Sequence, residues 1–361
     1  MWRTLSAAAM LLFSPGGSPV GAGSAVESPA AREAADRVVT NGTDTLAPGR
    51  AQPPPAEALY AIPTRIDRIG RIIVPVAVNC RGPFQFVLDT GASATVLSPH
   101  LVEALGLVAD PTQTVLMKGV TGSALVPTAP IDRLETGDIV LEGQRLAVAD
   151  AAFATMDGVL GADGFANKVV LVDFVRDRVS VLDARAHRPS PQLARIPATL
   201  QFGRLLMVDA LVGTHKIKAV VDTGAQRTLG NLALYAKLGL RPTQSYRDTT
   251  TEVFGATDSR QTGERHLVRQ VTMDPLRITN LTVTFGDFYI FKIWNLQSQP
   301  ALLIGMDMIG TLDIFGVDYL RREVQIKVAG PGSTASRAAL QRQRREAPNP
   351  LPLACQPATT Q

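Results

Sequence analysis

The chain has 361 residues, 45% hydrophobic and 19% charged, which excludes a disordered chain and is enough for two globular units with a sizeable core. The net charge of +4 is small, and no stretch of Lys and Arg is interleaved with aromatic residues, so we expect no nucleic-acid partner. Four isolated histidines and two cysteines give no zinc-ligand spacing, so we expect neither a metal nor another cofactor.

The first residues are typical of an export signal. Trp2 and Arg3 form a short charged end, Leu5 to Phe13 is apolar but too short to span a bilayer, and small residues follow up to Ala22 and Ala25. We therefore expect residues 1–25 to be a signal peptide and the protein to be secreted to the periplasm or the extracellular space. A disordered start and an uncleaved membrane anchor are the alternatives. After export, Cys80 and Cys355 either form one disulfide or remain two thiols.

Two segments have the composition of disordered chain. Residues 26–58 are rich in Ala, Pro, Gly and charge, and predict a linker, while residues 331–361 predict a disordered tail. The Arg-rich stretch 337–345 is more typical of a solvated tail than of a site for an acidic partner. Between these ends we expect two folded regions, 59–190 and 191–330, which join in the Pro-containing stretch 184–200.

The first folded region predicts short strands separated by Gly, Pro and Asp, a pattern that indicates a barrel or sandwich. We expect a turn at Gly82-Pro83 and one short helix over Leu101 to Leu107, with Gly106 near its end. Val115 to Val126, which contains Gly119 and Gly122, predicts a long hairpin. The expected strands are 72–78, 84–88, 145–149, 169–174 and 179–182.

The second folded region repeats this series. We expect a short helix over Ala233 to Leu238, ended by Gly239, and a hairpin over Val253 to Gly263 that contains Gly255. The expected strands are 205–212, 215–221, 281–285, 288–293 and 301–305.

The tetrapeptide Asp-Thr-Gly-Ala occurs in both regions, at 89–92 and 222–225, each time directly after an apolar run. An aligned threonine, Thr95 or Thr228, follows each copy. Each region also has a later apolar run that ends on glycine, with Gly161 placed 72 residues after Asp89 and Gly305 placed 83 residues after Asp222. The two regions therefore predict related halves, with 11 extra residues in the second.

Each motif residue has a physical role at the end of a buried strand. The strand holds Asp89 or Asp222 on a rigid element, Thr90 or Thr223 offers a hydroxyl to its own loop or to the partner loop, and Gly91 or Gly224 permits close backbone approach. Two carboxylates that meet across a pseudo-twofold axis resist double ionisation and share a proton. Such a pair can activate a water molecule for attack on a peptide carbonyl and protonate the leaving nitrogen, without a metal or a covalent intermediate.

The two motifs, including Ala92 and Ala225, resemble the active-site loops of retropepsin-type aspartic proteases. The runs that end at Gly161 and Gly305 are similar to the second motif of that family, and the resemblance covers about residues 68–183 and 203–328. It implies an all-β, bilobal acid-protease fold (pepsin/retropepsin-like), with two related closed-barrel lobes, 59–190 and 191–330, and a few short helices. It also implies an aspartic endopeptidase that cleaves polypeptides, with one catalytic Asp per lobe, Asp89 and Asp222, in one monomeric chain.

Some features depart from that family. Ser93-Ala94 and Gln226-Arg227 follow the two motifs where retroviral loops commonly carry acidic residues, and Arg227 either lowers the pKa of a nearby acid or pairs elsewhere. The first hairpin has no Tyr, so Gly119, Gly122 and Gly255 are the candidates for the flaps that cover the substrate. Asp163 and Asp307 also recur, and we expect them to brace the segments that follow.

Two other hypotheses remain open at this point. The same fold can serve as a non-catalytic peptide-binding module, or each lobe can pair with its counterpart in a second chain to form a homodimer. A peptide digest over a range of pH distinguishes the first from an enzyme, and the size of the active species tests the second.

Overall fold

The computed structural model describes residues 70–329 apart from 151–155, 203, 242–249 and 258, together with the backbone of four short strands that precede residue 70. These strands are β1 (Ser6–Ala7), β2 (Leu12–Ser14), β3 (Ala61–Pro63) and β4 (Arg65–Ile66). The expected cleavage positions at 22 and 25, the linker 26–58 and the tail 331–361 lie outside the described residues. Cys80 is disulfide-bonded, while Cys355, the only other cysteine of the chain, lies in that tail.

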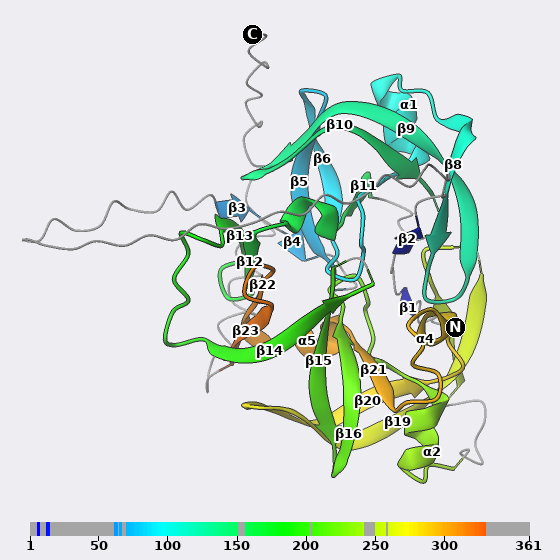
Figure 1. Cartoon of the computed structure of the whole chain (residues 1–361), viewed down its shortest axis with the longest axis vertical. Coiled ribbons are helices and arrows are strands. Elements are labelled where there is room, and N and C mark those ends of the chain that lie inside the picture. Colours follow the sequence, from blue (N-terminus) through cyan, green and yellow to red (C-terminus); the bar gives the residue numbers. More distant parts are fainter. Residues whose placement is uncertain are drawn as a thin grey trace, which may run out of the picture. The chain divides into compact units, whose positions relative to one another are not determined.

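The first lobe runs from Ile72 to Asp183 and is built almost entirely of strands (Figure 1). Its elements are β5 (Ile72–Val78), β6 (Arg81–Leu88), β7 (Val96–Leu97), α1 (Pro99–Leu105), β8 (Asp110–Lys118), β9 (Ser123–Thr136), β10 (Ile139–Val148), β11 (Gly158–Leu160), the 3-10 helix η1 (Ala162–Phe165), β12 (Lys168–Asp173) and β13 (Arg178–Asp183).

The second lobe follows after β14 (Ala194–Gln201), which lies in the expected joining stretch. Its elements are β15 (Leu205–Val212), β16 (His215–Val221), β17 (Leu229–Gly230), α2 (Leu232–Lys237), β18 (Thr250–Phe254), β19 (Arg260–Met273), β20 (Leu276–Phe285), α4 (Tyr289–Ile293), β21 (Ala301–Ile304), α5 (Met306–Ile309), β22 (Leu312–Asp318) and β23 (Glu323–Val328).

The two lobes repeat one strand order. In the first lobe the order across the sheet is β8-β9-β10-β7-β11-β6-β5, and in the second it is β18-β19-β20-β17-β21-β16-β15. The directions match as well, because β11 runs parallel to β6 as β21 does to β16, while β7 runs antiparallel to β11 as β17 does to β21. The expected mostly-β fold of two related lobes is confirmed.

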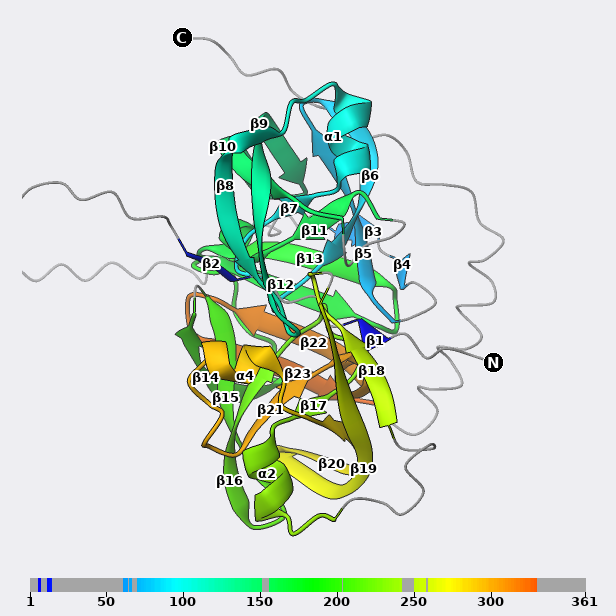
Figure 2. The same ribbon diagram turned by 90° about the vertical axis from the view of Figure 1, so that its right-hand side faces the viewer.

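A sheet of strands from both halves joins the lobes. Its order is β14-β23-β22-β12-β13-β3, and its central pair is antiparallel, with Val170 opposite Val317 and Leu171 opposite Gly316 (Figures 1 and 2). The Leu171 side chain lies directly over Gly316, where a Cβ atom would overlap it. Several apolar side chains of these strands, such as those of Val170 and Val317, belong to the same buried cluster as Leu88 and Val221, which precede the two motifs.

Local sequence signals explain the two helices that follow the motifs. The side chain of Ser98 caps α1 by accepting a hydrogen bond from the Leu101 amide at 3.1 Å, and Gly106 ends that helix with a φ of 69°. Asn231 caps α2 in the same way, with the Leu234 amide at 2.9 Å, and Gly239 follows with a φ of 63°. Both helices therefore begin and end within one or two residues of the expected positions.

Two expectations about local structure were wrong. Gly82-Pro83 lies inside β6, and the turn is formed by Asn79 and Cys80, which both have positive φ. The segment 288–293 contains the helix α4 and not a strand, although its aromatic and β-branched residues favour strands. There, Ile290 and Phe291 pack with Trp294 in a buried cluster, and this tertiary packing overrides the local preference.

Candidate active site

Both Asp-Thr-Gly-Ala motifs begin where a central strand of each lobe ends. Asp89 follows β6 and donates its backbone N–H to the Leu160 carbonyl of β11 at 3.0 Å. Asp222 follows β16 and donates in the same way to the Ile304 carbonyl of β21, also at 3.0 Å. Each aspartate is thus fixed by two parallel strands of its own lobe, and both are fully buried.

Each carboxylate is held by its own loop through one oxygen. The backbone amides of Gly91 and Ala92 donate to Oδ1 of Asp89 at 2.7 and 3.0 Å. The amides of Gly224 and Ala225 donate to Oδ1 of Asp222 at 2.8 and 3.1 Å. The second oxygen, Oδ2, receives no hydrogen bond in either residue. Each carboxylate therefore has one oxygen that is held by its loop and one that is buried without a hydrogen-bond partner.

The motif threonines bind the two loops to each other. The Thr90 amide donates to Oγ1 of Thr223 at 3.0 Å, and the Thr223 amide donates to Oγ1 of Thr90 at 3.1 Å. The two hydroxyls in turn donate to the carbonyls of Val221 and Leu88 at 3.2 and 2.9 Å. The sequence left open whether these hydroxyls bind their own loop or the partner loop, and in the structure they bind the partner loop.

The motif glycines bring the two carboxyl groups side by side. A Cβ atom on Gly91 would overlap the carboxyl group of Asp222, and a Cβ atom on Gly224 would overlap that of Asp89. No other residue type leaves room for the carboxylate of the opposite lobe at these positions. The two aspartates that the sequence predicts as partners therefore meet at one place in the molecule.

Burial and proximity change the acidity of both groups. Burial raises the pKa of Asp222 from 3.8 to about 6, although the neighbouring carboxyl group of Asp89 and the amides of its own loop act in the opposite direction. Burial also raises the pKa of Asp89 well above 3.8, and the like charge and the adjacent side chain of Asp222 raise it further. Two adjacent charges are costly in this buried place, so the pair favours a single negative charge.

A second pair of carboxylates supports the loops from behind. Oδ1 of Asp163 accepts from the Thr95 hydroxyl at 2.7 Å and Oδ2 accepts from the Thr95 amide at 2.8 Å. Asp307 binds Thr228 in the same manner, at 2.7 and 3.0 Å. These contacts run back to the motif loops. The expected contact with the following segment is present as well, because the Gly164 amide donates to Oδ1 of Asp163 at 3.0 Å.

The glycines of the second motif lie against the same loops. A Cβ atom on Gly161 would overlap the backbone of Ala94, and one on Gly305 would come within 2.7 Å of the backbone of Arg227. Both glycine amides also donate to the hydroxyl of Thr95 or Thr228 at 3.2 Å. These glycines therefore position the loops and lie behind the carboxylates.

The flap candidates lie at the tips of two hairpins that reach toward each other (Figure 2). Gly119 and Gly122 close the tip between β8 and β9, where the Gly119 amide donates to the Gly122 carbonyl at 2.7 Å. Gly255 lies at the tip between β18 and β19, and a Cβ atom there would come within 2.6 Å of the hydroxyl of Thr121. The tips of the two lobes are therefore in contact.

The residues that depart from the family pattern act outside the aspartate pair. Arg227 is a neighbour of Asp307, whose pKa it lowers, against the larger opposite effect of burial. Gln226 is buried, and its amide nitrogen has no hydrogen-bond partner. Neither residue is a cause of the raised pKa of Asp89 or Asp222.

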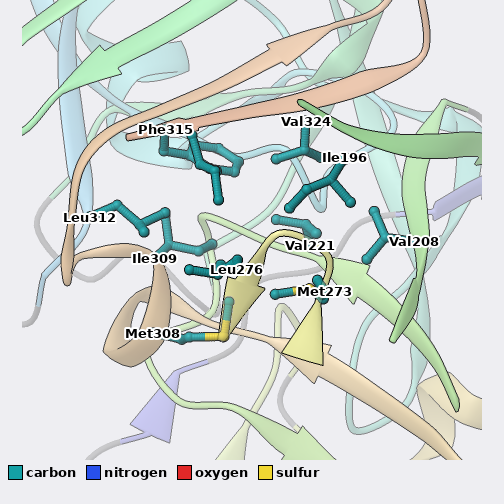
Figure 3. Close-up of a pocket in the computed structure, with 11 residues that line it drawn as sticks. Ile196, Val208, Val221, Met273, Leu276, Met308, Ile309, Leu312, Phe315 and Val324 are labelled. Atoms are coloured by element: carbon teal, nitrogen blue, oxygen red, sulfur yellow. The ribbon is translucent and has the colours of Figure 1, made fainter. Parts of the chain in front are cut away.

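A cavity next to Val221 is lined only by apolar side chains, such as those of Phe315 and Met273, and these offer no catalytic group (Figure 3). In the part of the chain that the structure describes, no group of three or more His, Cys, Asp or Glu side chains could hold a metal ion. Among the described helices, none is long and apolar enough to cross a membrane.

Comparison with known families agrees with this geometry. The family described as aspartyl protease matches residues 74–163 and 208–308, which together make up more than half of the chain. The chain belongs to the aspartyl protease family. No individual characterised protein matches this protease closely enough to add a relative. Each matched region contains one Asp-Thr-Gly-Ala motif and one second-motif glycine, as expected for a retropepsin-like protease with two tandem lobes.

Some contacts of the protease were not predicted from its sequence. The sequence analysis did not predict that Asp163 and Asp307 accept hydrogen bonds from Thr95 and Thr228, respectively. The two threonines recur at matching positions, and this was a signal for the contact. The contact between the hairpin tips was also missed, since the residues involved lie more than 130 positions apart in the chain.

Proposed function

We propose that this protease is an aspartic endopeptidase in which Asp89 and Asp222 form one catalytic pair. The observation that carries the proposal is that each buried carboxylate has one oxygen held by its loop and one without a partner, while each lies against the motif glycine of the other lobe. A water molecule bound by both Oδ2 atoms would be the nucleophile.

A pair with one shared proton divides the work between its two members. Burial raises the pKa of both groups, that of Asp222 to about 6, so the pair retains one proton, which we place on Asp89. In our proposal Asp222 takes a proton from the water as its oxygen forms a bond to the carbonyl carbon. Protonated Asp89 donates its proton to the developing oxyanion. The proton gained by Asp222 passes to the leaving nitrogen as the C–N bond breaks, and one hydroxyl proton of the tetrahedral intermediate returns to Asp89, which leaves a carboxylic acid, an amine and a pair that again holds one proton.

The substrate class that the family implies is a polypeptide. Two strand pairings support an extended conformation for the substrate. The consecutive strands β1 and β2 lie on the edges of the two hairpins, where β1 pairs in parallel with β18 and β2 pairs antiparallel with β8. They show that an extended chain can pair with both hairpins. The equivalent strands β8 and β18 are expected to run in opposite directions across a pseudo-twofold axis. A single extended chain that crosses the axis must then be parallel to one and antiparallel to the other, as β1 and β2 are on these two edges.

The test is cleavage of a peptide library by the native protein and by the variants Asp89→Asn and Asp222→Asn. We expect both variants to lose cleavage and to retain the far-UV circular dichroism of the native protein. Asp209→Asn is the matched control, because Asp209 is exposed and pairs only with Lys218 among the contacts described. Undiminished cleavage by either active-site variant would remove that aspartate from the mechanism.

The alternatives are tested by the same material. A native protein that binds extended peptides and never cleaves them, at any pH, would be a peptide-binding module, and the two free carboxylate oxygens argue against this reading. A homodimer with exchanged lobes would be active only at twice the mass of one chain. Four hydrogen bonds join the loop that contains Thr90 to the loop that contains Thr223 within one chain, and they favour an active monomer.

We also propose that the protein is exported with its first residues as the signal. N-terminal sequencing of the mature protein from separated cell fractions tests this, and a cytoplasmic protein that retains Trp2 would contradict it.

A further inference from the structure

The tips of the two hairpins repeat a pattern that the family comparison does not explain. Residues 119–123 read Gly-Val-Thr-Gly-Ser and residues 255–259 read Gly-Ala-Thr-Asp-Ser, so Thr121 and Thr257 occupy equivalent positions. Each threonine follows an apolar residue, Val120 or Ala256, and both apolar residues are fully buried.

Each tip packs against the opposite lobe. Val120 of the first lobe belongs to the buried cluster that contains Ala225, the last residue of the second motif loop, and its carbonyl accepts from the Ile290 amide of α4 at 3.1 Å. Ala256 of the second lobe belongs to the cluster that contains Ala92 of the first motif loop. The two tips therefore lie close to both active-site loops, and each is anchored in the lobe to which it does not belong.

The threonine side chains between these anchors are buried and lack partners. Thr121 is 6% exposed and Thr257 is 5% exposed, and neither hydroxyl makes a hydrogen bond. A buried hydroxyl without a partner destabilises a folded protein, which is why such groups are rare away from ligand sites. Oδ2 of Asp89 and of Asp222 has the same property, so the buried polar atoms without a partner include one symmetric pair on the loops and one on the tips.

We propose that Thr121 and Thr257 bind the backbone of the substrate, one on each side of the scissile bond. An extended peptide presents both N–H and C=O groups, and a threonine hydroxyl can donate to one or accept from the other. This inference rests on the proposed peptidase activity and adds to it a pair of binding residues on the hairpins. Because the pseudo-twofold axis passes between the two aspartates, the two hydroxyls contact opposite halves of the substrate.

The experiment compares Thr121→Val and Thr257→Val with Thr121→Ser and Thr257→Ser on a peptide that extends at least three residues on each side of the cleaved bond. Each valine variant should lower kcat/KM by roughly fivefold, the value of one neutral hydrogen bond, and each serine variant should stay within about twofold of the native protein. The valine variants should unfold at the same or a higher temperature, since an unpartnered hydroxyl has been removed. A purely structural threonine would show the opposite change in stability.

A second arm uses peptides shortened on one side of the cleaved bond. Thr121→Val should no longer lower kcat/KM for peptides shortened on one side, because the native threonine has no backbone group to bind there. Thr257→Val should no longer lower kcat/KM for peptides shortened on the other side. The inference is overturned if both valine variants match the native kcat/KM, if serine and valine variants lose activity equally, or if both valine variants respond to the same shortened peptide. In each of these cases cleavage by the native protein and its loss in Asp89→Asn would leave the proposed peptidase intact.

Discussion

Replacement of Asp222 by Asn should stabilise the protein at neutral pH while it removes cleavage. Asp222 is fully buried, and burial raises its pKa from 3.8 to about 6. At about 1.4 kcal/mol for each pKa unit, this shift corresponds to about 3 kcal/mol of unfolding free energy that the native protein forgoes when the group is ionised. Asparagine has no ionised form, and its Oδ1 atom can still accept from the amides of Gly224 and Ala225.

The effect has a definite pH dependence. Below about pH 3.8, Asp222 is protonated in both the folded and the unfolded chain, so the native protein and the variant have similar unfolding free energies. As the pH rises from 3.8 to about 6, the unfolded chain releases this proton and the folded protein keeps it, so the native unfolding free energy falls. Above pH 6 the difference should level off at about 3 kcal/mol in favour of the variant.

Urea unfolding at pH 4 and at pH 7.5, followed by circular dichroism, measures this difference. Asp209→Asn is again the matched control, because that carboxylate is exposed and its removal should give no gain that grows with pH. An Asp222→Asn protein that has the same unfolding free energy relative to the native protein at both pH values would refute the reasoning, since burial would then not disfavour the charged form.

Three further predictions concern the same loops. Gly224→Ala places a methyl group against the carboxyl group of Asp89, and the displacement should lower kcat by about 100-fold with little change in circular dichroism; near-native kcat would contradict the contact. Thr223→Val leaves the Thr90 amide without its acceptor and should lower the unfolding free energy by about 2 kcal/mol, whereas Thr223→Ser should retain most of it; equal urea midpoints for the two variants would argue against the cross-lobe bonds. The acidic limb of the pH profile of kcat/KM should lie near pH 6, where Asp222 ionises, and a limb near pH 4 would show that the pair is less buried in solution.

Much of the fold could be predicted because local and global preferences agree. The strands β15 and β16 have the bounds that their apolar runs predict, and Gly106 and Gly239 follow the last residues of their helices because glycine readily takes the positive φ found there. The segment 288–293 shows the limit of this approach, because its residues favour a strand and only the packing of the second lobe makes it a helix.

The site was predictable to the extent that chemistry repeats along the chain. Two copies of Asp-Thr-Gly-Ala were sufficient to expect that Asp89 and Asp222 meet, because neither copy alone can form a pair. The hydroxyls of Thr121 and Thr257 were not identified, since a Thr in a hairpin is ordinary and its lack of a partner exists only in three dimensions. The same holds for the hydrogen bonds that Thr95 donates to Asp163, which connect residues 68 positions apart.

The pairing of β12 with β22 has a consequence for how this protein can change over time. In an assembly of two identical chains, every substitution occurs on both sides of the axis, and a change that helps one end of the groove is imposed on the other. Here the partner is covalently attached, so one half can alter while its counterpart stays as it was. A symmetric dimer could not have the differences that this chain has between its halves. One loop has Ser93 where the other has Gln226, and among the described residues the helix α4 lies beside the second loop alone.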